Sequence, residues 1–227
     1  MTPSLLRHRL LDACGVEHGF GVRGADGPNS VVRPRQVHGA NTVTLEECAR
    51  EKTPEADAVV SAAPEVLIGV VTADCVPILL STVGGTAVAA VHAGWRGLGR
   101  GVATAGVAAL RRLAGPEQDL CAVVGPHIGR CCYEVDRPVL DELEVRFAQR
   151  LSHALGSGRP GHWMLDLAAL VRMELATAGI EGPAFEVLPN ACTCCDRQRF
   201  HSYRRDGPSS GRLHHFISAR PQRPGQI

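Results

Sequence analysis

The chain has 227 residues, of which 44% are hydrophobic and only 4% aromatic, so one large domain can form with a core of Val, Leu, Ile and Ala. Because 24 basic residues balance 23 acidic ones, charge gives no reason to expect nucleic acid or an anionic membrane as a partner. No apolar run reaches the roughly 18 residues of a membrane helix, no apolar signal region follows Met1–Leu11, and the nine cysteines suit reduced or metal-bound thiols, so we expect a cytoplasmic protein without a membrane partner.

Nine short runs predict β-strands. Two of them, 66–71 and 87–91, are continuously apolar, which is typical of strands buried on both faces. Pro77 lies just inside another run, so that strand either lies at a sheet edge or begins there. The predicted strands are His18–Arg23, Asn41–Leu45, Ala58–Ala62, Val66–Thr72, Val76–Ser81, Thr86–His92, Leu120–Gly125, Ala184–Leu188 and His214–Ala219.

Three helices are predicted, most of them in the second half of the chain. The first, Gly101–Leu113, follows a glycine-rich turn; Asp136 is expected to cap Pro138–His153, and Asp166 a helix that ends at Ala178. Since strands and helices do not alternate strictly, we predict an α+β fold, an α/β sandwich with mixed β-sheets, rather than a doubly wound one. A single domain is expected over 1–227, with a frayed tail at 221–227.

Three segments each place a metal ligand beside small residues: 36–39 with His38, 72–75 with Cys75, and 91–97 with His92. Two imidazoles and one thiol would leave a fourth tetrahedral position for water or substrate, as in catalytic zinc sites. A short loop at 83–85 predicts a hairpin that brings Cys75 and His92 to the same end. Spacing gives no such argument for His38, and the gaps are too long for a zinc finger.

Asp74 is expected to orient a ligand or to take part in proton transfer beside a metal-bound Cys75. Without a metal, the same residues predict a different enzyme, a cysteine hydrolase or deamidase with Cys75 as nucleophile, His92 as base and Asp74 as orienting group. Taken one at a time, a cysteine between apolar strands is more often a core residue, and a histidine at a strand end is more often a surface residue.

Two further segments carry arginine next to features that suit anions. The run 94–101 could expose backbone N–H groups to phosphate beside Arg96 or Arg100, or simply turn a strand into a helix. Tyr203, Arg204 and Arg205 could bind an anion or a ribose, or form a solvated arginine cluster. A second metal among Cys131, Cys132, Cys192, Cys194 and Cys195 is not favoured, since adjacent cysteines rarely chelate one zinc well.

Five sequence blocks together resemble the YfiH, or laccase-domain-containing, family, also known as DUF152 and as polyphenol oxidase. The blocks are Arg35–Gly39, Thr72–Pro77, His92–Gly97, Gly125–Val135 (Gly-Pro-His-Ile-Gly through Tyr-Glu-Val) and Phe200–Gly207. The resemblance implies a single-domain YfiH-like fold of the cysteine hydrolase type, a monomer or homodimer, and Zn²⁺ held by His38, Cys75 and His92. His127 departs from the family pattern, where a small residue or cysteine is commoner.

The resemblance also implies purine nucleosides and phosphate as partners: phosphorolysis of adenosine, inosine and methylthioadenosine, and deamination of adenosine. We expect zinc-activated water to attack adenine C6, and phosphate to attack ribose C1′. The expected substrate-binding residues are Arg35, Gln36, Arg96, Tyr203, Arg204 and Arg205. Copper-dependent phenol oxidation is less favoured, because laccase copper sites use His-x-His pairs and this chain has only the adjacent pair His214–His215. A non-enzymatic interaction module would leave the glycine-flanked ligands unexplained.

Overall fold

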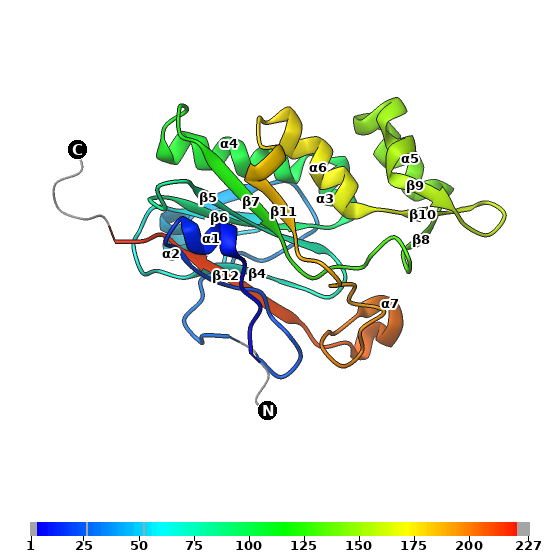
Figure 1. The fold of residues 1–227 in the computed structure, drawn as a ribbon, viewed down its shortest axis with the longest axis horizontal. Coiled ribbons are helices and arrows are strands. Elements are labelled where there is room, and N and C mark those ends of the chain that lie inside the picture. Colours follow the sequence, from blue (N-terminus) through cyan, green and yellow to red (C-terminus); the bar gives the residue numbers. More distant parts are fainter. Residues whose placement is uncertain (1–3, 26, 52, 222–227) are drawn as a thin grey trace.

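A six-stranded mixed sheet forms the centre of the molecule in the computed structural model, which describes residues 4–25, 27–51 and 53–221. Its strand order is β11-β7-β5-β6-β3-β2 (Figure 1). The pairs β11–β7 and β2–β3 are parallel and the other pairs antiparallel. The strands are β2 (Thr42–Thr44), β3 (Ala58–Ser61), β5 (Val76–Thr82), β6 (Val88–Ala93), β7 (Leu120–Val124) and β11 (Phe185–Val187).

Two layers cover the faces of this sheet. One face is covered by helices α3 (Trp95–Gly99), α4 (Val102–Ala114) and α6 (Leu167–Thr177), with α5 (Arg137–Phe147) packed against α3. The other face packs against a three-stranded antiparallel sheet of order β1-β12-β4 (Figure 1). That second sheet consists of β1 (Glu17–Gly19), β4 (Ile68–Thr72) and β12 (Leu213–Ser218). The mixed α/β architecture with mixed sheets in a single domain is therefore the predicted one.

Alternation along the strands explains why both faces of the central sheet are buried. In β5, Ile78 and Leu80 join the core under the helices, whereas Leu79 joins the core between the two sheets, and all three are fully buried. The sequence supplies apolar residues on both sides of each central strand, so two hydrophobic cores can form on one sheet.

The longer helices follow the predicted order. Helix α4 (Val102–Ala114) begins after Gly101, whose φ of 85° is left-handed, and α6 (Leu167–Thr177) begins with the Asp166 carboxylate accepting the Ala169 N–H at 3.0 Å. The predicted helix to His153 is too long: α5 (Arg137–Phe147) ends where Ala148 takes a φ of 46°, and η1 (Ala148–Ala154) continues as a 3₁₀ helix. Asp136 precedes α5 but forms no side-chain cap bond.

Pro77 does not mark an edge strand, because β5 lies between β7 and β6; it is the second residue of the strand, and its carbonyl accepts the Gly125 N–H at 2.9 Å. The short elements were not predicted from the sequence, and most of them have few buried residues. These are α1 (Arg9–Ala13), α2 (Leu45–Glu51), α3 (Trp95–Gly99), β8 (Glu134–Asp136), β9 (Leu155–Ser157), β10 (His162–Leu165), η2 (Gly182–Ala184), α7 (Tyr203–Asp206) and η3 (Gly207–Ser209). Strands β8, β10 and β9 form a third small sheet.

None of the helices formed by the described residues is long and apolar enough to cross a membrane. The tail expected to be frayed lies outside those residues, except for Pro221.

Candidate metal centre

The β5–β6 hairpin brings Cys75 and His92 to one end of the central sheet. Val76 pairs with Ala93 and Pro77 with His92, so Cys75, just before β5, lies beside the end of β6, as the short connecting loop predicts. His38 reaches the same point from the loop before β2. One potential ligand atom from each of the three residues lies within 4.8 Å of the other two. The structure thus brings all three predicted ligands together.

Asp57, which no sequence pattern indicated, organises this meeting point from a fully buried position. One carboxylate oxygen accepts the N–H of Val37 at 3.2 Å and of Gly39 at 2.6 Å, and the other accepts the N–H of His38 at 2.9 Å. The Nδ1 of His92 lies 2.7 Å from the same carboxylate. Asp57 therefore holds the His38 loop and the His92 ring in place together.

The hydrogen bond to Asp57 also fixes which nitrogen of His92 is free. Because a carboxylate only accepts, Nδ1 carries the proton and donates it, and Nε2 is left with its lone pair. A carboxylate bound to the far nitrogen of a histidine ligand is a recurrent arrangement in metal sites. The Asp57–His92 pair is thus suited to present Nε2 to a metal.

Gly94 allows the thiol and the imidazole to approach each other. A Cβ atom at this position would lie 3.0 Å from Cys75 Sγ and 3.2 Å from His38 Cδ2. His38 and Asp74 themselves have positive φ angles, 58° and 88°. Left-handed residues other than glycine cost energy and gather at functional sites, so the backbone here is shaped around the cluster rather than for regular structure.

The electrostatics of the pair favour a thiolate. Burial raises the pKa of Cys75, but the charge of His92 and a hydrogen bond from His38 outweigh it and lower the pKa to about 6. Burial lowers the pKa of His92, but the charge of Cys75 and the hydrogen bond to Asp57 outweigh it and raise the pKa to about 9. Without a metal, Cys75 and His92 form a thiolate–imidazolium pair.

The three donors fit a divalent metal with an open coordination position. One thiolate and two imidazoles are soft and borderline ligands that suit zinc, and three protein ligands are the number found in catalytic zinc sites. A trigonal His₂Cys set also occurs in blue-copper sites, where a weak axial methionine completes it. Neither Met164 nor Met173 lies at this cavity.

A cavity of about 630 Å³ opens over the cluster. Its walls combine arginines with aromatic rings, a mixture that suits a ligand with both an anionic and a flat apolar part. The lining residues are Arg33, Pro34, Gln36, His38, Val71, Thr72, Ala73, Asp74, Cys75, His92, Trp95, Arg96, Tyr133, Tyr203, Arg204 and Arg212.

Four of the six predicted substrate-binding residues line this cavity: Gln36, Arg96, Tyr203 and Arg204. The Gln36 amide exchanges two 2.8 Å hydrogen bonds with the backbone of Val71, so it ties the His38 loop to the end of β4. The guanidinium of Arg96 lies 4.3 Å from the ring centroid of Trp95.

The other two substrate-binding predictions, Arg35 and Arg205, point elsewhere. Arg35 is exposed and pairs with Glu55. Arg205 pairs with Asp206 at 2.7 Å and donates to the carbonyls of Thr193, Cys194 and Phe200, so it clamps the C-terminal loop. Neither lines the cavity. Arg100, considered for the turn at 94–101, is also outside it and pairs with Glu142.

Asp74 lines the cavity, but its carboxylate accepts hydrogen bonds from a neighbouring segment of the chain. One oxygen accepts the hydroxyl of Thr193 at 2.5 Å and the other the backbone N–H of Arg204 at 2.6 Å. Asp74 therefore anchors the segment that carries Tyr203 and Arg204. His127 is buried, its Nδ1 lies 2.8 Å from the Gly125 carbonyl, and it does not line the cavity.

Arg33 also lines the cavity, although sequence patterns did not suggest a role for it. Its Nε and Nη2 are buried and have no hydrogen-bond partner among the described residues, and burial lowers its pKa. A guanidinium in this situation calls for an acceptor, because unsatisfied buried donors are costly. Arg33 lies two residues before Arg35, the residue that begins the first block of the resemblance. This position is the one sequence feature that could have pointed to Arg33.

Comparisons with known proteins agree with the fold and with the family resemblance. A family model described as "Multi-copper polyphenol oxidoreductase laccase" matches residues 21–220. A Xylella fastidiosa protein named purine nucleoside phosphorylase is 41% identical over 179 residues, which is 76% of this chain and 66% of that protein. The chain therefore spans slightly less than two thirds of that relative. Purine nucleoside phosphorylase YlmD of Geobacillus stearothermophilus is 32% identical over 82% of this chain and 71% of its own length.

Solved structures show the same architecture. The hypothetical protein YfiH of Bacillus licheniformis superposes with a TM-score of 0.81 at 26% identity, covering 91% of this chain and 93% of that one. A Neisseria meningitidis protein described as DUF152 gives a TM-score of 0.75 at 36% identity, over 84% and 75% of the two chains. The family model, the relatives and the solved structures agree with one another, and the chain belongs to the laccase-like YfiH (DUF152) family.

Proposed function

We propose that this chain is a zinc-dependent purine nucleoside phosphorylase that also deaminates adenosine. The observation that carries the proposal is the His38–Cys75–His92 cluster, which opens onto a 630 Å³ cavity lined by both arginines and aromatic rings. The names of the relatives supply the substrate class. Adenosine, inosine and methylthioadenosine are the proposed nucleosides, with phosphate as the second substrate.

Arg33 is the first proposed ligand for phosphate. Arg33 lines the cavity, two of its nitrogens have no partner among the described residues, and a guanidinium binds phosphate with two donors at once. Arg96, Arg204 and Arg212 line the same cavity and add positive charge. In phosphorolysis, a phosphate oxygen forms a bond to ribose C1′, the bond from C1′ to N9 breaks, and the purine leaves with its electron pair and takes a proton.

The aromatic residues of the cavity are proposed to hold the purine. Tyr203 is 52% exposed, which is unusual for a large ring and leaves a face free for stacking. Tyr133 is fixed by the Arg204 guanidinium, 4.9 Å from its ring centroid. Arg204 also donates to the Glu134 carbonyl at 2.8 Å, so ring and guanidinium form one rigid wall.

When bound, zinc supplies a Lewis acid that polarises an oxygen or acidifies water. The chain's own contribution is to keep Cys75 deprotonated, to hold Nδ1–H of His92 on Asp57, and to fix the His38 loop through three backbone N–H groups. Asp74 positions the segment of Tyr203 and Arg204 at the side of the cluster.

The phosphate role of Arg33 is tested by Arg33→Ala, with Arg35→Ala as the matched control two residues away. Release of hypoxanthine from inosine is measured against phosphate concentration. We expect KM for phosphate to rise at least tenfold in Arg33→Ala, since a charge-assisted pair is lost, and to stay unchanged in Arg35→Ala. Equal effects in both variants, or base release that does not depend on phosphate, would refute this role.

The metal is tested by elemental analysis of the purified protein and of Cys75→Ala. Zinc that depends on Cys75, together with activity restored by zinc to the metal-free protein, supports the proposal. Copper bound at Cys75, with phenol oxidation and no base release from inosine, would instead support the function in the family model's description.

One observation favours a second function, a metal-free cysteine hydrolase. The Cys75 thiolate, His92 and Asp57 have the order nucleophile, base and orienting carboxylate, with Asp57 rather than Asp74 in the third place. Rapid alkylation of Cys75 in a protein that binds no metal, with complete loss of activity, would support that function and exclude the zinc centre.

The nine cysteines form no disulfide, which fits the proposed location in a reducing compartment such as the cytoplasm. Whether the protein is a monomer or a homodimer stays a prediction that light scattering tests.

A further inference from the structure

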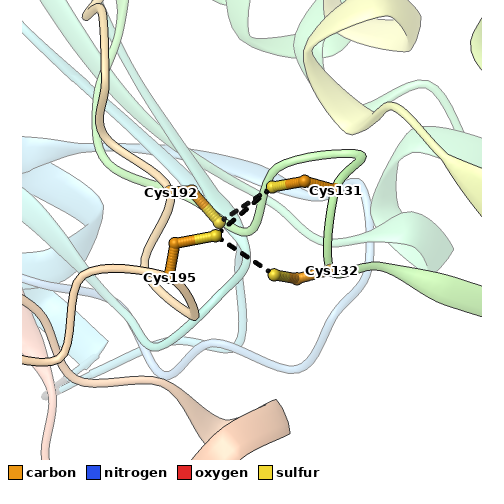
Figure 2. Close-up of side chains that lie close together, drawn as sticks. All are labelled: Cys131, Cys132, Cys192 and Cys195. Carbon is orange, nitrogen blue, oxygen red and sulfur yellow. Dashed lines mark hydrogen bonds between the residues drawn. The ribbon is translucent and has the colours of Figure 1, made fainter.

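Four cysteines from two distant segments meet at the surface, away from the three ligands described above. Cys131 and Cys132 come from the turn after β7, and Cys192 and Cys195 from the loop after β11 (Figure 2). Their sulfur atoms all lie within 4.8 Å of one another. We propose that these four thiols bind a structural Zn²⁺ ion, separate from the proposed catalytic one.

The sulfur separations match a tetrahedral metal site. Cys131 Sγ lies 3.6 Å from Cys192 Sγ and 3.5 Å from Cys195 Sγ, and Cys132 Sγ lies 3.3 Å from Cys195 Sγ. Zinc–sulfur bonds of about 2.3 Å at tetrahedral angles put the sulfurs about 3.8 Å apart. A disulfide needs about 2.05 Å, so the four side chains are spaced as ligands around a common centre.

The backbone supports the cluster on both sides. Cys192 and Cys195 have the C-x-x-C spacing of zinc ribbons, and the Gly129 N–H donates to Cys192 Sγ at 3.2 Å. A Cβ at Gly129 would lie 3.2 Å from Cys131 Sγ and 3.4 Å from Cys192 Sγ. Gly129 thus gives the thiols room and supplies a donor for thiolate charge.

A tight turn allows the adjacent residues Cys131 and Cys132 to bind one metal ion, which adjacent cysteines rarely do well. The N–H groups of Cys132 and Tyr133 both donate to the Gly129 carbonyl, at 3.0 and 3.2 Å. In this turn both sulfurs of the pair face the loop at 192–195 (Figure 2). Four sulfur donors select zinc or iron, and zinc requires no redox partner. On binding, each thiol releases its proton to solvent, and zinc keeps its oxidation state.

The ion would join two segments that shape the cavity. The first contains Ile128, whose N–H donates to the Asp74 carbonyl at 3.0 Å, and Tyr133, which lines the cavity. The second contains Thr193, whose hydroxyl donates to the Asp74 carboxylate. Zinc between them would fix the wall of the cavity without touching the substrate.

Metal content tests the proposal without any nucleoside, so its outcome is independent of the proposed function. Proteins are purified with a reductant, supplied with zinc and desalted. We expect about two zinc ions per chain in the unchanged protein and about one in Cys75→Ala. Adding Cys131→Ser and Cys195→Ser to Cys75→Ala should remove the last ion, whereas adding Cys194→Ser, the matched control outside the cluster, should leave it.

A second measurement uses cobalt in Cys75→Ala. Four thiolates should give the sulfur-to-metal charge-transfer absorption and the visible bands of tetrahedral cobalt, and Cys131→Ser with Cys195→Ser should abolish both. The proposal is overturned if Cys75→Ala retains no zinc, if its zinc survives the loss of Cys131 and Cys195, if the cluster carries iron, or if thiol titration of the reduced, denatured and undenatured protein reveals a disulfide among the four.

Discussion

A single buried carboxylate, Asp57, connects the parts of the candidate metal centre that come from different segments. It binds three consecutive N–H groups of the His38 loop and the ring of His92. Burial raises its pKa, but the hydrogen bonds from His92 and Gly39 outweigh this and lower it. The carboxylate is therefore ionised at neutral pH, and it can accept all four hydrogen bonds at once.

Replacing this carboxylate should loosen the metal. Asp57→Asn turns one acceptor into a donor that faces N–H groups, so we expect zinc affinity at the His38–Cys75–His92 cluster to fall about 10- to 100-fold. Competition with a chromophoric chelator measures the affinity. Glu55→Gln, an exposed carboxylate two residues earlier, is the control and should leave it unchanged. Equal affinities in Asp57→Asn and the unchanged protein would contradict the assignment.

His215 should make stability depend on pH. It is fully buried; burial, and then the charges of His214, Arg33 and His92, lower its pKa to about 3. The Gly21 N–H lies 3.3 Å from Nδ1, and Nε2 lies 2.9 Å from the Thr72 hydroxyl, so the ring is neutral. The unfolded chain takes up a proton below a pH of about 6.5 and the folded protein does not.

The contribution of His215 is thus present above pH 6.5 and lost as the pH falls toward 3, by about 2 kcal/mol between pH 6.5 and 5. Urea unfolding at pH 7 and 5 measures it. His215→Gln should reduce the difference between the two pH values by that amount. His18 and His127, whose pKa burial also lowers, contribute equally in both proteins. An unchanged difference would show that His215 is not the source.

At the scale of elements, the β5–β6 hairpin and the turn into α3 determine the geometry of the His38–Cys75–His92 cluster. A side chain at Gly94 would lie against Cys75 Sγ and His38 Cδ2. We expect Gly94→Ala to weaken zinc binding about tenfold or more, because closely packed atoms must move apart. Gly84→Ala, in the loop at the opposite end of the hairpin, is the control, since its nearest neighbour is 3.9 Å away. Competition with a chelator measures the zinc affinity of both variants. An equal loss in Gly84→Ala would show that the close contact at Gly94 is not the cause.

Apart from the end of β1, which is predicted at Arg23 and lies at Gly19, the buried strands could be predicted to within about two residues because their apolar runs are dictated by burial on both faces. Strands β8, β9 and β10 could not, since they are three or four residues long and mostly half-buried. The end of α5 depends on the positive φ of Ala148, which no local signal marks. Short elements owe their form to tertiary contacts rather than to propensity.

For the whole molecule, the central sheet must be buried on both sides. Leu79 and Leu80 are consecutive residues of β5 that lie in different cores. We expect Leu79→Ala and Leu80→Ala each to lower the free energy of unfolding by about 2–5 kcal/mol. Val83→Ala, at a position 56% exposed, should change it by less than about 0.5 kcal/mol. Chemical denaturation measures all three, and a large loss in only one leucine variant would contradict the three-layer packing.

The residues of the site that meet through local structure could be predicted from the sequence, whereas those that meet through the whole fold could not. Cys75 and His92 meet because of one hairpin, which the sequence alone suggests. His38 comes from a separate loop, and only the family resemblance pointed to it. Asp57 and Arg33 matter through contacts and burial that depend on the whole fold, and the choice between Arg33 and Arg35 rests on which side of the loop each faces.

The proposed metal ligands and the aromatic residues of the cavity come from different parts of the chain. The proposed metal ligands and Asp57 lie between residues 38 and 92, whereas Tyr133, Tyr203, Arg204 and Arg212 come from the remainder. The residues proposed to bind the metal and the aromatic rings proposed to hold the purine are therefore encoded in separate stretches of the gene, whereas Arg33, the proposed phosphate ligand, lies close to His38 in the sequence. If the proposed function holds, exchange of the segment 196–212 between relatives should change the fit of the purine and leave both proposed sets of metal ligands intact, so new specificities could arise by recombination.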